Sequence, residues 1–449
     1  MKFTDLNLNG PLLNAIDELG FTEPTPIQEK VFSKVMSGQD VVGIAQTGTG
    51  KTLAFLLPIL RNLKFSKQNH PRVLIIVPTR ELVIQIVERT EELAKYTNCR
   101  IYGVYGGANI NIQKQVIHDH GLDILVATPG RLHDLALSGV LRLKDIKQLV
   151  IDEMDEMLNL GFRPQLLNIL DILPERRQNL LFSATITEDV EFFTNKFFSA
   201  PDKIEAAGAG TPVSLITQKV YQVPNFLSKV SLLHNLLEDE NKFSKVLVFA
   251  GSRKFADRLY EHIEPKFEEK VGVIHSNKSQ NYRINSVQSF ADGTYRVLIA
   301  TDLISRGIDI KDVSHVINFH MPDEVESYVH RVGRTGRADR RGVALSFITE
   351  QESSIQSQIE ELIDKPLEIV EMPKEVEFTT ELIEEERPKV EETNYLPKPK
   401  AKTLDERGPA FHEKSAKNSK TNQGGSYRRE IKKKYKKPKT RGQKKRGNR

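Results

Sequence analysis

A run of small, hydroxylated and basic residues between two apolar segments has the composition of a phosphate-binding loop. It reads AQTGTGKT over residues 45–52, follows a strand-like segment at 40–44 and opens a helix-like one at 53–57. Glycines here let backbone N–H groups face phosphate oxygens, and a helix start adds positive potential. We expect Lys51 to reach the β- and γ-phosphates of a nucleotide and the Thr52 hydroxyl to bind Mg²⁺. The predicted nucleotide-binding residues of this loop are Ala45, Gln46, Thr47, Gly48, Thr49, Gly50, Lys51 and Thr52.

Two neighbouring carboxylates could supply the metal ligand and the water-polarising group that such a loop lacks. The run VIDEMD at residues 150–155 places Asp152 and Glu153 directly after an apolar, strand-like segment. A carboxylate at a strand end can hold Mg²⁺ through its water shell, and a neighbouring one can orient and polarise an attacking water. We assign the first role to Asp152 and the second to Glu153. An acidic pair after a strand is by itself often only a solvated helix start, but its combination with the phosphate loop favours nucleotide hydrolysis.

The elements around these residues are short apolar runs that alternate with amphipathic, helix-like stretches. Runs rich in Val, Ile and Leu are typical of strands buried on both faces, which predicts parallel sheets covered by helices. Because the series occurs twice, the predicted fold class is α/β with two similar domains in tandem. The strand-like runs lie at residues 73–77, 124–126 and 149–151, and then at 246–249, 271–274, 297–299 and 316–319.

Changes in composition predict the domain boundaries. A first domain at residues 1–205 and a second at 215–370 are joined by a linker of small residues at 206–214, and 371–449 form an acidic and then basic tail. From residue 401 onward, 18 Lys or Arg stand against 4 Asp or Glu, a net charge of +14 that leaves −9 for residues 1–400 out of a total of +5. A terminal block of this kind is typically disordered and binds polyanions.

The overall composition is that of a globular protein. Of the 449 residues, 39% are hydrophobic and 28% are charged, and no apolar run approaches the length of a bilayer span. The N-terminus lacks the layout of a signal peptide, so we expect a cytoplasmic protein with no membrane partner. Cys99 is the only cysteine, which excludes an intramolecular disulfide and a cysteine-based metal cluster.

The ordered set of motifs resembles the DEAD-box family of ATP-dependent RNA helicases, and in particular its bacterial members. The resemblance runs from Phe3 to about residue 348 and implies two RecA-like domains that close around ATP and a single RNA strand. The segment GFTEPTPIQ at residues 20–28 is similar to the family's Q motif. Gln28 offers a donor and an acceptor to an adenine edge, and Phe3 or Phe21 can stack on it. Ala45 stands where the strict phosphate loop has Gly, as it does in many helicases.

Short motifs after the predicted strands resemble the RNA-contact motifs of this family. Hydroxyls, arginines and helix-start amides at the carboxyl edge of a parallel sheet grip a phosphodiester backbone without reading bases, so we expect little sequence specificity. In the first domain the resemblance implies RNA contacts by Thr79, Arg80, Gly106, Gly107, Thr128 and Arg131. In the second domain it implies contacts by Arg253, Gln280, Arg283, Thr301 and Gly307.

The run HRVGRTGR at residues 330–337 spaces arginines among glycines, which suits a loop better than a long helix. By resemblance, Arg334 and Arg337 act as arginine fingers on the γ-phosphate, a contribution of about 10³ to 10⁵ in rate, and Asp309 binds the ribose. The resemblance also implies that Asp155, Ser183, Thr185 and His330 couple hydrolysis to RNA release. The catalytic residues Lys51, Asp152, Glu153, Arg334 and Arg337 are thus divided between two domains. Closure of the domains by ATP and by RNA should make each tighten the binding of the other.

Met154 stands where the family's acidic motif has Ala. Both catalytic carboxylates remain beside it, so we expect hydrolysis to persist. We predict that the added bulk near the coupling residues alters coupling or turnover.

Other functions stay open at this point. The same two-domain build serves DNA helicases and duplex translocases, and an ATP-gated RNA clamp with little unwinding shares every motif above. A metal-dependent nuclease or a GTPase switch needs none of the second-domain motifs, so the presence of these motifs argues against both functions. Ribosomal precursors, messenger decay and cold adaptation all fit as RNA targets or pathways, with other RNA-processing proteins as partners. The basic tail is expected to tether RNA, and its alternatives are a solubilising or an autoinhibitory segment.

Overall fold

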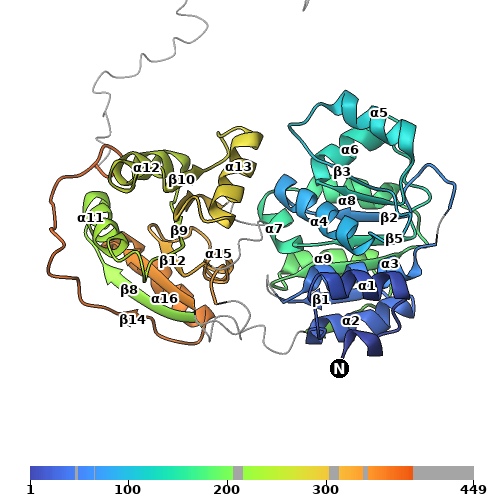
Figure 1. Ribbon diagram of the computed structural model, residues 1–449, viewed down its shortest axis with the longest axis horizontal. Helices are drawn as coiled ribbons and strands as arrows, with labels where there is room; N and C mark the ends of the chain where they lie inside the picture. Colours follow the sequence, from blue (N-terminus) through green and yellow to red (C-terminus); the bar gives the residue numbers. More distant parts are fainter. Residues whose placement is uncertain (46–48, 65, 206–215, 303–312, 337–341, 388–449) are drawn as a thin grey trace, which may run out of the picture. The chain divides into compact units, whose positions relative to one another are not determined.

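The computed structural model describes residues 1–45, 49–64, 66–205, 216–302, 313–336 and 342–387. The predicted linker and the basic tail fall outside these ranges. The described residues form two seven-stranded sheets in which every pairing is parallel, each covered by helices (Figure 1). The predicted α/β class with two tandem domains is therefore confirmed.

The first domain is built on a sheet of strand order β3-β4-β2-β5-β6-β1-β7. Its strands are β1 (Val41–Ile44), β2 (Val73–Ile76), β3 (Ile101–Val104), β4 (Ile124–Ala127), β5 (Gln148–Ile151), β6 (Gln178–Ser183) and β7 (Asp202–Glu205). Its helices are η1 (Phe3–Asp5), α1 (Gly10–Glu18), α2 (Pro26–Met36), α3 (Lys51–Asn62), α4 (Arg80–Leu93), α5 (Ile110–His120), α6 (Pro129–Leu137), α7 (Met154–Asn159), α8 (Arg163–Ile172) and α9 (Glu188–Phe197).

The second domain repeats this plan. Its strand order, β10-β11-β9-β12-β13-β8-β14, is the order of the first sheet with every strand number raised by seven. Its strands are β8 (Ile216–Gln222), β9 (Val246–Phe249), β10 (Val271–Ile274), β11 (Val297–Ala300), β12 (His315–Asn318), β13 (Gly342–Ile348) and β14 (Glu368–Ile369). Its helices are α11 (Phe226–Leu237), α12 (Arg253–Phe267), α13 (Gln280–Ala291), α15 (Val325–Val332), η2 (Glu350–Glu352) and α16 (Ser353–Leu362).

Each sheet has a hydrophobic core on both faces, because successive strand residues point to opposite sides. On β2, Val73 and Ile75 join the core formed with α1 to α4, whereas Leu74 and Ile76 join the core formed with α5 to α9. All four side chains are at most 1% exposed. This double burial explains why the strands read as continuous apolar runs rather than as alternating ones.

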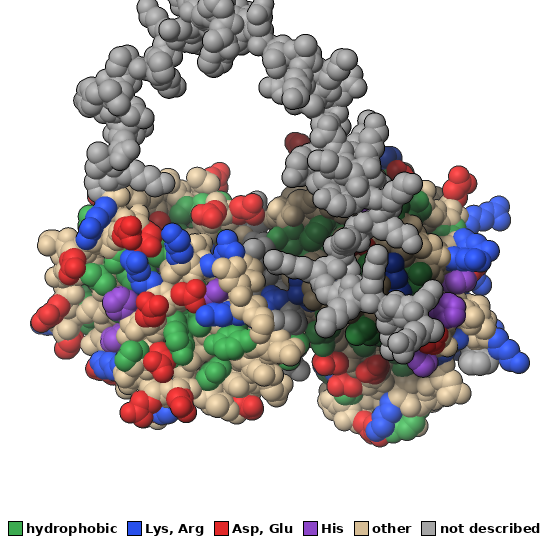
Figure 2. All heavy atoms as spheres, turned by 90° about the horizontal axis from the view of Figure 1, so that it is seen from above, with side chains coloured by type: hydrophobic (Ala, Val, Ile, Leu, Met, Phe, Trp, Pro, Cys, Tyr) green, Lys and Arg blue, Asp and Glu red, His purple; other side chains and the backbone are tan. Residues whose placement is uncertain are grey.

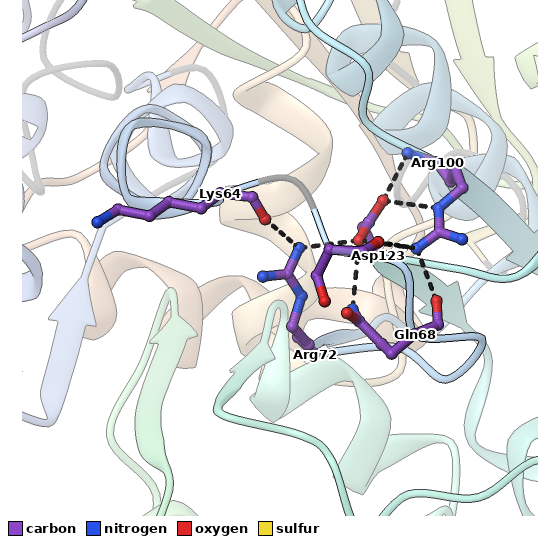
Figure 3. A network of polar contacts seen from close by, with 6 residues as sticks. Lys64, Gln68, Arg72, Arg100 and Asp123 are labelled. Atoms are coloured by element: carbon purple, nitrogen blue, oxygen red, sulfur yellow. Dashed lines mark hydrogen bonds and ion pairs between the residues drawn. The ribbon is translucent and has the colours of Figure 1, made fainter.

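A polar network ties together the amino ends of three neighbouring strands of the first domain (Figure 3). The Asp123 carboxylate, just before β4, accepts hydrogen bonds from Arg72 at 2.8 Å, before β2, and from the Arg100 side chain at 3.0 Å, before β3. Burial by itself raises the pKa of Asp123, but the hydrogen bonds from Arg100 and Arg72 outweigh burial and lower the pKa. The network lies at the edge of the sheet opposite to the ends that carry the site residues, so we assign it a structural role.

The tail begins later than predicted, because residues 371–387 pack on the second domain. The side chains of Val376 and Ile383 are buried in the core that α11 and α12 share with the second sheet. The Glu386 carboxylate accepts a hydrogen bond from the Phe226 N–H at 2.6 Å, and Arg258 pairs with Glu385 at 2.6 Å. This segment is acidic in sequence, but it packs on the second domain.

The surface carries charges of both signs. On the face shown in Figure 2, Lys and Arg side chains are interspersed with Asp and Glu on the described residues. Within the described part of the chain, no helix combines the length and apolar character that crossing a membrane requires. Cys99 lies partly buried against the first core, and burial raises the pKa of its thiol to about 12.

Candidate nucleotide site and RNA-binding surface

The predicted phosphate loop falls between β1 and α3, and the structure describes Ala45 and residues 49–52 of it. Gly50 is the N-cap of α3 with φ of 92°, a left-handed conformation that favours glycine, and α3 begins at Lys51. The Lys51 side chain is 6% exposed, and its Nζ has no hydrogen-bond partner among the described residues. A buried ammonium without a partner is costly, so this geometry fits an anionic ligand. Gln46, Thr47 and Gly48 lie outside the described residues.

The acidic pair lies at the carboxyl end of β5. Asp152 and Glu153 are 3% and 7% exposed, and Asp152 Oδ1 accepts a hydrogen bond from the Glu153 N–H at 3.0 Å. Glu153 has φ of 53°, an uncommon conformation for a residue with a side chain and one that is often found at functional sites.

Burial governs the charge of both carboxyls. It raises the pKa of Asp152, and it raises the pKa of Glu153 to about 7. The positive charge of Lys51 acts in the opposite direction on both groups. A carboxyl with a pKa near neutrality is typical of catalytic groups.

Asp155 connects the acidic motif to the segment after β6. Its carboxylate accepts hydrogen bonds from the Ala184 N–H at 3.0 Å, the Thr185 N–H at 3.0 Å and the Thr185 hydroxyl at 3.1 Å. The Asp155 N–H donates to the Ser183 hydroxyl at 3.3 Å. The structure therefore brings three of the four predicted coupling residues into one hydrogen-bonded group.

The Gln28 side chain bridges the predicted adenine motif and the phosphate loop. Its Oε1 accepts from the Thr25 N–H at 2.9 Å and its Nε2 donates to the Gly50 carbonyl at 3.1 Å. A Cβ atom at Gly50 would collide with this amide, so the close approach also requires glycine. Phe3 is 4% exposed within the core, whereas Phe21 is 37% exposed, so Phe21 offers the more accessible ring for stacking.

Three loops of the first domain bring the predicted RNA-contact residues together. The Thr79 hydroxyl caps α4 by accepting from the Leu82 N–H at 3.3 Å. The guanidinium of Arg80, the first residue of α4, lies so close to Gly107 that a Cβ there would displace it. Arg131, on α6, donates to Gln113 at 2.6 Å and to the Ala108 carbonyl at 3.0 Å. Gly106 belongs to the same loop as Ala108, and Thr128 is the N-cap of α6.

In the second domain, an ion pair between Arg331 and Asp302 positions the end of β11. Neither residue was predicted to belong to a site. Arg331 is 2% exposed and binds Asp302 through two hydrogen bonds of 2.6 Å each. This bidentate pair joins the residue after Thr301 to α15, the helix that carries His330 and precedes Arg334. The TD dipeptide after a strand and the arginine next to His330 were the available signals. The pairing itself spans 29 residues of sequence and was not predicted.

Some of the other site residues predicted in the second domain are described by the structure, and the rest lie outside the described residues. Arg334 is 3% exposed and its Nε donates to the His330 carbonyl at 3.3 Å, and the exposed Arg253 donates to Asn277 at 2.7 Å. Arg283 lies on α13 and is 9% exposed. Outside the described residues lie Gly307, Asp309, Arg337 and the side chain of Gln280.

Met154 does not point toward the coupling residues. Its side chain is fully buried and belongs to the core cluster of α5 to α9, together with Leu166 and Phe193. The bulk that we expected near Asp155 is accommodated in this core. An effect on coupling remains a prediction, and the direct consequence of this position concerns stability.

Family models match both domains. The DEAD/DEAH box helicase model covers residues 25–193, and the helicase conserved C-terminal domain model covers residues 228–339. The DEAD-box ATP-dependent RNA helicase RhpA of Helicobacter pylori is 40% identical over 373 residues, 83% of this chain and 74% of that protein. The ATP-dependent RNA helicase RhlB of Pseudomonas syringae pv. tomato is 40% identical over 374 residues, 82% of this chain and 94% of that protein.

Solved structures resemble the fold of both domains. S. cerevisiae Dbp5 bound to RNA and ADP BeF3 has a TM-score of 0.73 at 29% identity, over 82% of this chain and 95% of that one. Mss116p bound to ssRNA and AMP-PNP has a TM-score of 0.76 at 26% identity, over 84% of this chain and 81% of that one. Both domains are therefore RecA-like. At 40% identity over more than four fifths of the chain, and with a family model matched in each domain, the chain belongs to the DEAD-box ATP-dependent RNA helicases.

Proposed function

We propose that this helicase hydrolyses ATP with a set of residues divided between its two domains and uses the cycle to unwind or remodel short RNA duplexes and ribonucleoproteins. Lys51 binds the β- and γ-phosphates, Glu153 orients and polarises the attacking water, and Arg334 and Arg337 stabilise the charge that develops during phosphoryl transfer. The observation that carries this proposal is the buried Lys51, whose Nζ makes no hydrogen bond to the described residues, beside two buried carboxyls whose pKa values burial raises.

The residues at this site fit a magnesium ion bound together with ATP. Mg²⁺ prefers one or two protein oxygens, with phosphate and water completing its coordination. Asp152 and the Thr52 hydroxyl supply oxygens of this kind, and among the described residues no group of three or more His, Cys, Asp or Glu forms an all-protein metal cage. The ion would neutralise phosphate charge when bound. Asp152 would hold it, while Glu153 remains free to accept a hydrogen bond from water.

Coupling between ATP and RNA would pass through Asp155. The carboxylate fixes the backbone of residues 184 and 185, so any movement of α7 that accompanies hydrolysis is transmitted to the segment after β6. ATP and RNA that each favour the closed arrangement of the domains must strengthen the binding of one another by the same factor. His330 and the arginine fingers would complete the site from the second domain.

The RNA partner would be held mainly through its backbone. Arg80, Arg131 and Arg253 supply cations, and Thr79 and Thr128 supply hydroxyls at helix starts, none of which distinguishes bases. The basic residues beyond 400 would add a non-specific tether, which predicts a steep decrease of affinity with salt. We place the enzyme in the cytoplasm, where both ATP and RNA are available, with ribosomal precursors among the candidate substrates.

Stimulation of ATP hydrolysis by RNA and by DNA of the same sequence tests this proposal. Stimulation by single-stranded RNA alone, together with displacement of a short RNA strand, supports a helicase. Equal stimulation by DNA would favour a DNA translocase. ATP-dependent RNA binding without strand displacement would favour a clamp.

A further inference from the structure

The proposed function does not use His320, although this residue lies at the carboxyl edge of the second sheet among the predicted site residues. It follows β12 by two positions, and β12 pairs with β9 so that Asn318 lies opposite Phe249. The His320 N–H donates to the Phe249 carbonyl at 3.2 Å. The segments that follow these two strands are therefore side by side.

The imidazole of His320 faces the loop that follows β9. Its Nδ1 accepts a hydrogen bond from the Gly251 N–H at 3.3 Å, and a Cβ added at Gly251 would lie 3.2 Å from the Cβ of His320. Gly251 stands two residues before Arg253, which is a predicted RNA contact. Between them, the Ser252 hydroxyl caps α12 by accepting from the Phe255 N–H at 3.3 Å. The His320 side chain thus holds the loop that leads to Arg253.

The backbone of the same residue contacts the helix that precedes the arginine finger. The His320 carbonyl accepts a hydrogen bond from the Arg331 guanidinium at 2.6 Å, and a charged donor makes this a strong bond. Arg331 lies on α15 and also binds Asp302 after β11. Arg334 follows α15 and donates to the His330 carbonyl of that helix at 3.3 Å. One residue therefore joins the RNA-contact loop to the helix from which Arg334 extends.

Two charged side chains hold the residues on either side of His320. Lys229 Nζ donates to the Phe319 carbonyl at 2.9 Å, and the Met321 N–H donates to the Glu352 carboxylate at 2.9 Å. Lys229 is 1% exposed and pairs with Glu352 at 2.8 Å, so neither charge is left unpaired in the interior. Hydrogen bonds to charged groups on both neighbours make the backbone at His320 a stiff connection.

The environment keeps the imidazole neutral. Burial, followed by the positive charge of Lys229, lowers the pKa of His320 to about 3. The ring is packed against Phe255 and Phe319, with ring centres 4.4 Å and 5.1 Å away. A neutral imidazole has one nitrogen that can accept a hydrogen bond, and the Gly251 N–H identifies it as Nδ1.

We infer that His320 is a positioning residue that couples RNA binding at the loop of residues 251–253 to the placement of Arg334. The inference rests on the proposed function, because it takes Arg253 as an RNA contact and Arg334 as an arginine finger. RNA bound to the loop holds Gly251 in place, and the contacts of His320 pass this constraint to α15. ATP that engages Arg334 in turn favours the loop arrangement that binds RNA.

The test measures how much AMP-PNP tightens the binding of a short, single-stranded RNA to the full chain. The coupling factor is the Kd for RNA without AMP-PNP divided by the Kd with it. His320→Leu keeps an apolar side chain among the aromatic rings but removes the acceptor, and we expect the coupling factor to fall about five- to tenfold, the size expected for one hydrogen bond. His320→Asn keeps an acceptor near the position of Nδ1 and should restore the factor to within about twofold of the wild type.

His315→Leu is the matched control. His315 is a buried histidine at the opposite end of β12, 4% exposed and packed against Phe243 with ring centres 4.2 Å apart. Burial lowers its pKa as well, to about 4. Because His315 lies at the amino end of the strand, away from the loop and from α15, we expect His315→Leu to keep the coupling factor of the wild type.

His320→Gln supplies a second comparison that is informative even if His320→Leu does not fold. Glutamine places its polar atoms near the position of Nε2 rather than Nδ1, so His320→Gln should lose coupling where His320→Asn keeps it. Three results would each overturn the inference and leave the helicase assignment intact. They are an unchanged coupling factor in a folded His320→Leu, the same loss in His315→Leu, and equal coupling factors in the Asn and Gln variants. A wild-type chain whose ATP hydrolysis does not respond to RNA overturns the proposed function as well.

Discussion

The carboxylate of Asp155 accepts two hydrogen bonds from Thr185, one from its backbone N–H at 3.0 Å and one from its hydroxyl at 3.1 Å. Asp155 is 5% exposed and stands two residues after Glu153. Because of these two hydrogen bonds, we expect any shift of the acidic motif during the ATPase cycle to displace Thr185 as well. Hydrogen bonds to a charged acceptor are roughly twice as strong as neutral ones, which makes this link stiff.

Replacement of the Thr185 hydroxyl should separate hydrolysis from unwinding. Thr185→Val removes one of the three hydrogen bonds to Asp155 Oδ2 and preserves side-chain shape, at a cost of about 1.5 to 3 kcal/mol for a bond to a charged group. We expect strand displacement per ATP hydrolysed to fall several-fold, while Lys51 and Glu153 still support RNA-stimulated hydrolysis. Thr194→Val is a suitable control, because the Thr194 hydroxyl donates within α9, to the Val190 carbonyl at 2.9 Å. Equal unwinding per ATP in Thr185→Val and wild type would remove Thr185 from the coupling path.

The Glu153 carboxyl should make stability depend on pH. Burial raises its pKa from 4.5 to about 7 in the folded chain, so between these values the native state keeps a proton that the unfolded state releases. Its contribution therefore becomes less favourable as pH rises from about 4.5 to 7, and above pH 7 the folded chain carries a buried charge. Glu153→Gln has no such charge. Near pH 5 we expect the variant and the wild type to unfold at similar temperatures. Near pH 8 we expect the variant to unfold at the higher temperature, because its free energy of unfolding should exceed that of the wild type by an amount on the order of 1 to 3 kcal/mol.

Thermal unfolding of the nucleotide-free proteins at the two pH values measures this difference. A gap between Glu153→Gln and wild type that narrows toward pH 8 has the opposite sign and would show that the carboxyl is not held in an unfavourable environment.

Truncation of Met154 should destabilise the first domain. The side chain is fully buried, so Met154→Ala leaves a cavity, and we expect a loss of about 2 to 5 kcal/mol in the free energy of unfolding. Met154→Leu conserves most of the volume and should cost less than about 1.5 kcal/mol. Chemical denaturation of both variants checks this order. If Met154→Ala proved as stable as the wild type, the side chain would not fill the core as described, and an effect on coupling would become its main consequence.

The sequence predicted the parts of the fold that depend on burial. Strands covered on both faces need apolar residues at every position, and runs such as 73–77 and 246–249 show this directly. The positions of residues 45 and 152–153, each directly after a strand, were predictable as well, because each follows such a run and the carboxyl ends of parallel strands meet at one edge of the sheet.

The rest depended on contacts between distant residues. The pairing of Arg331 with Asp302 and the bond from Gln28 to the Gly50 carbonyl each join segments whose proximity only the folded chain sets. Residues 371–387 are rich in acidic side chains, and this composition conceals the two apolar residues, Val376 and Ile383, that pack on the second domain. The direction of Met154 follows from the phase of α7, which a six-residue helix does not reveal in sequence.

The most direct test of the account is the RNA-stimulated ATPase rate of the wild type, Lys51→Ala and Glu153→Gln. Removal of the phosphate-binding ammonium or of the water-polarising carboxylate should lower the rate at saturating RNA by at least about a hundredfold. The wild type should respond to RNA and not to DNA of the same sequence. Full RNA-stimulated hydrolysis by either variant would contradict the assignment of the site.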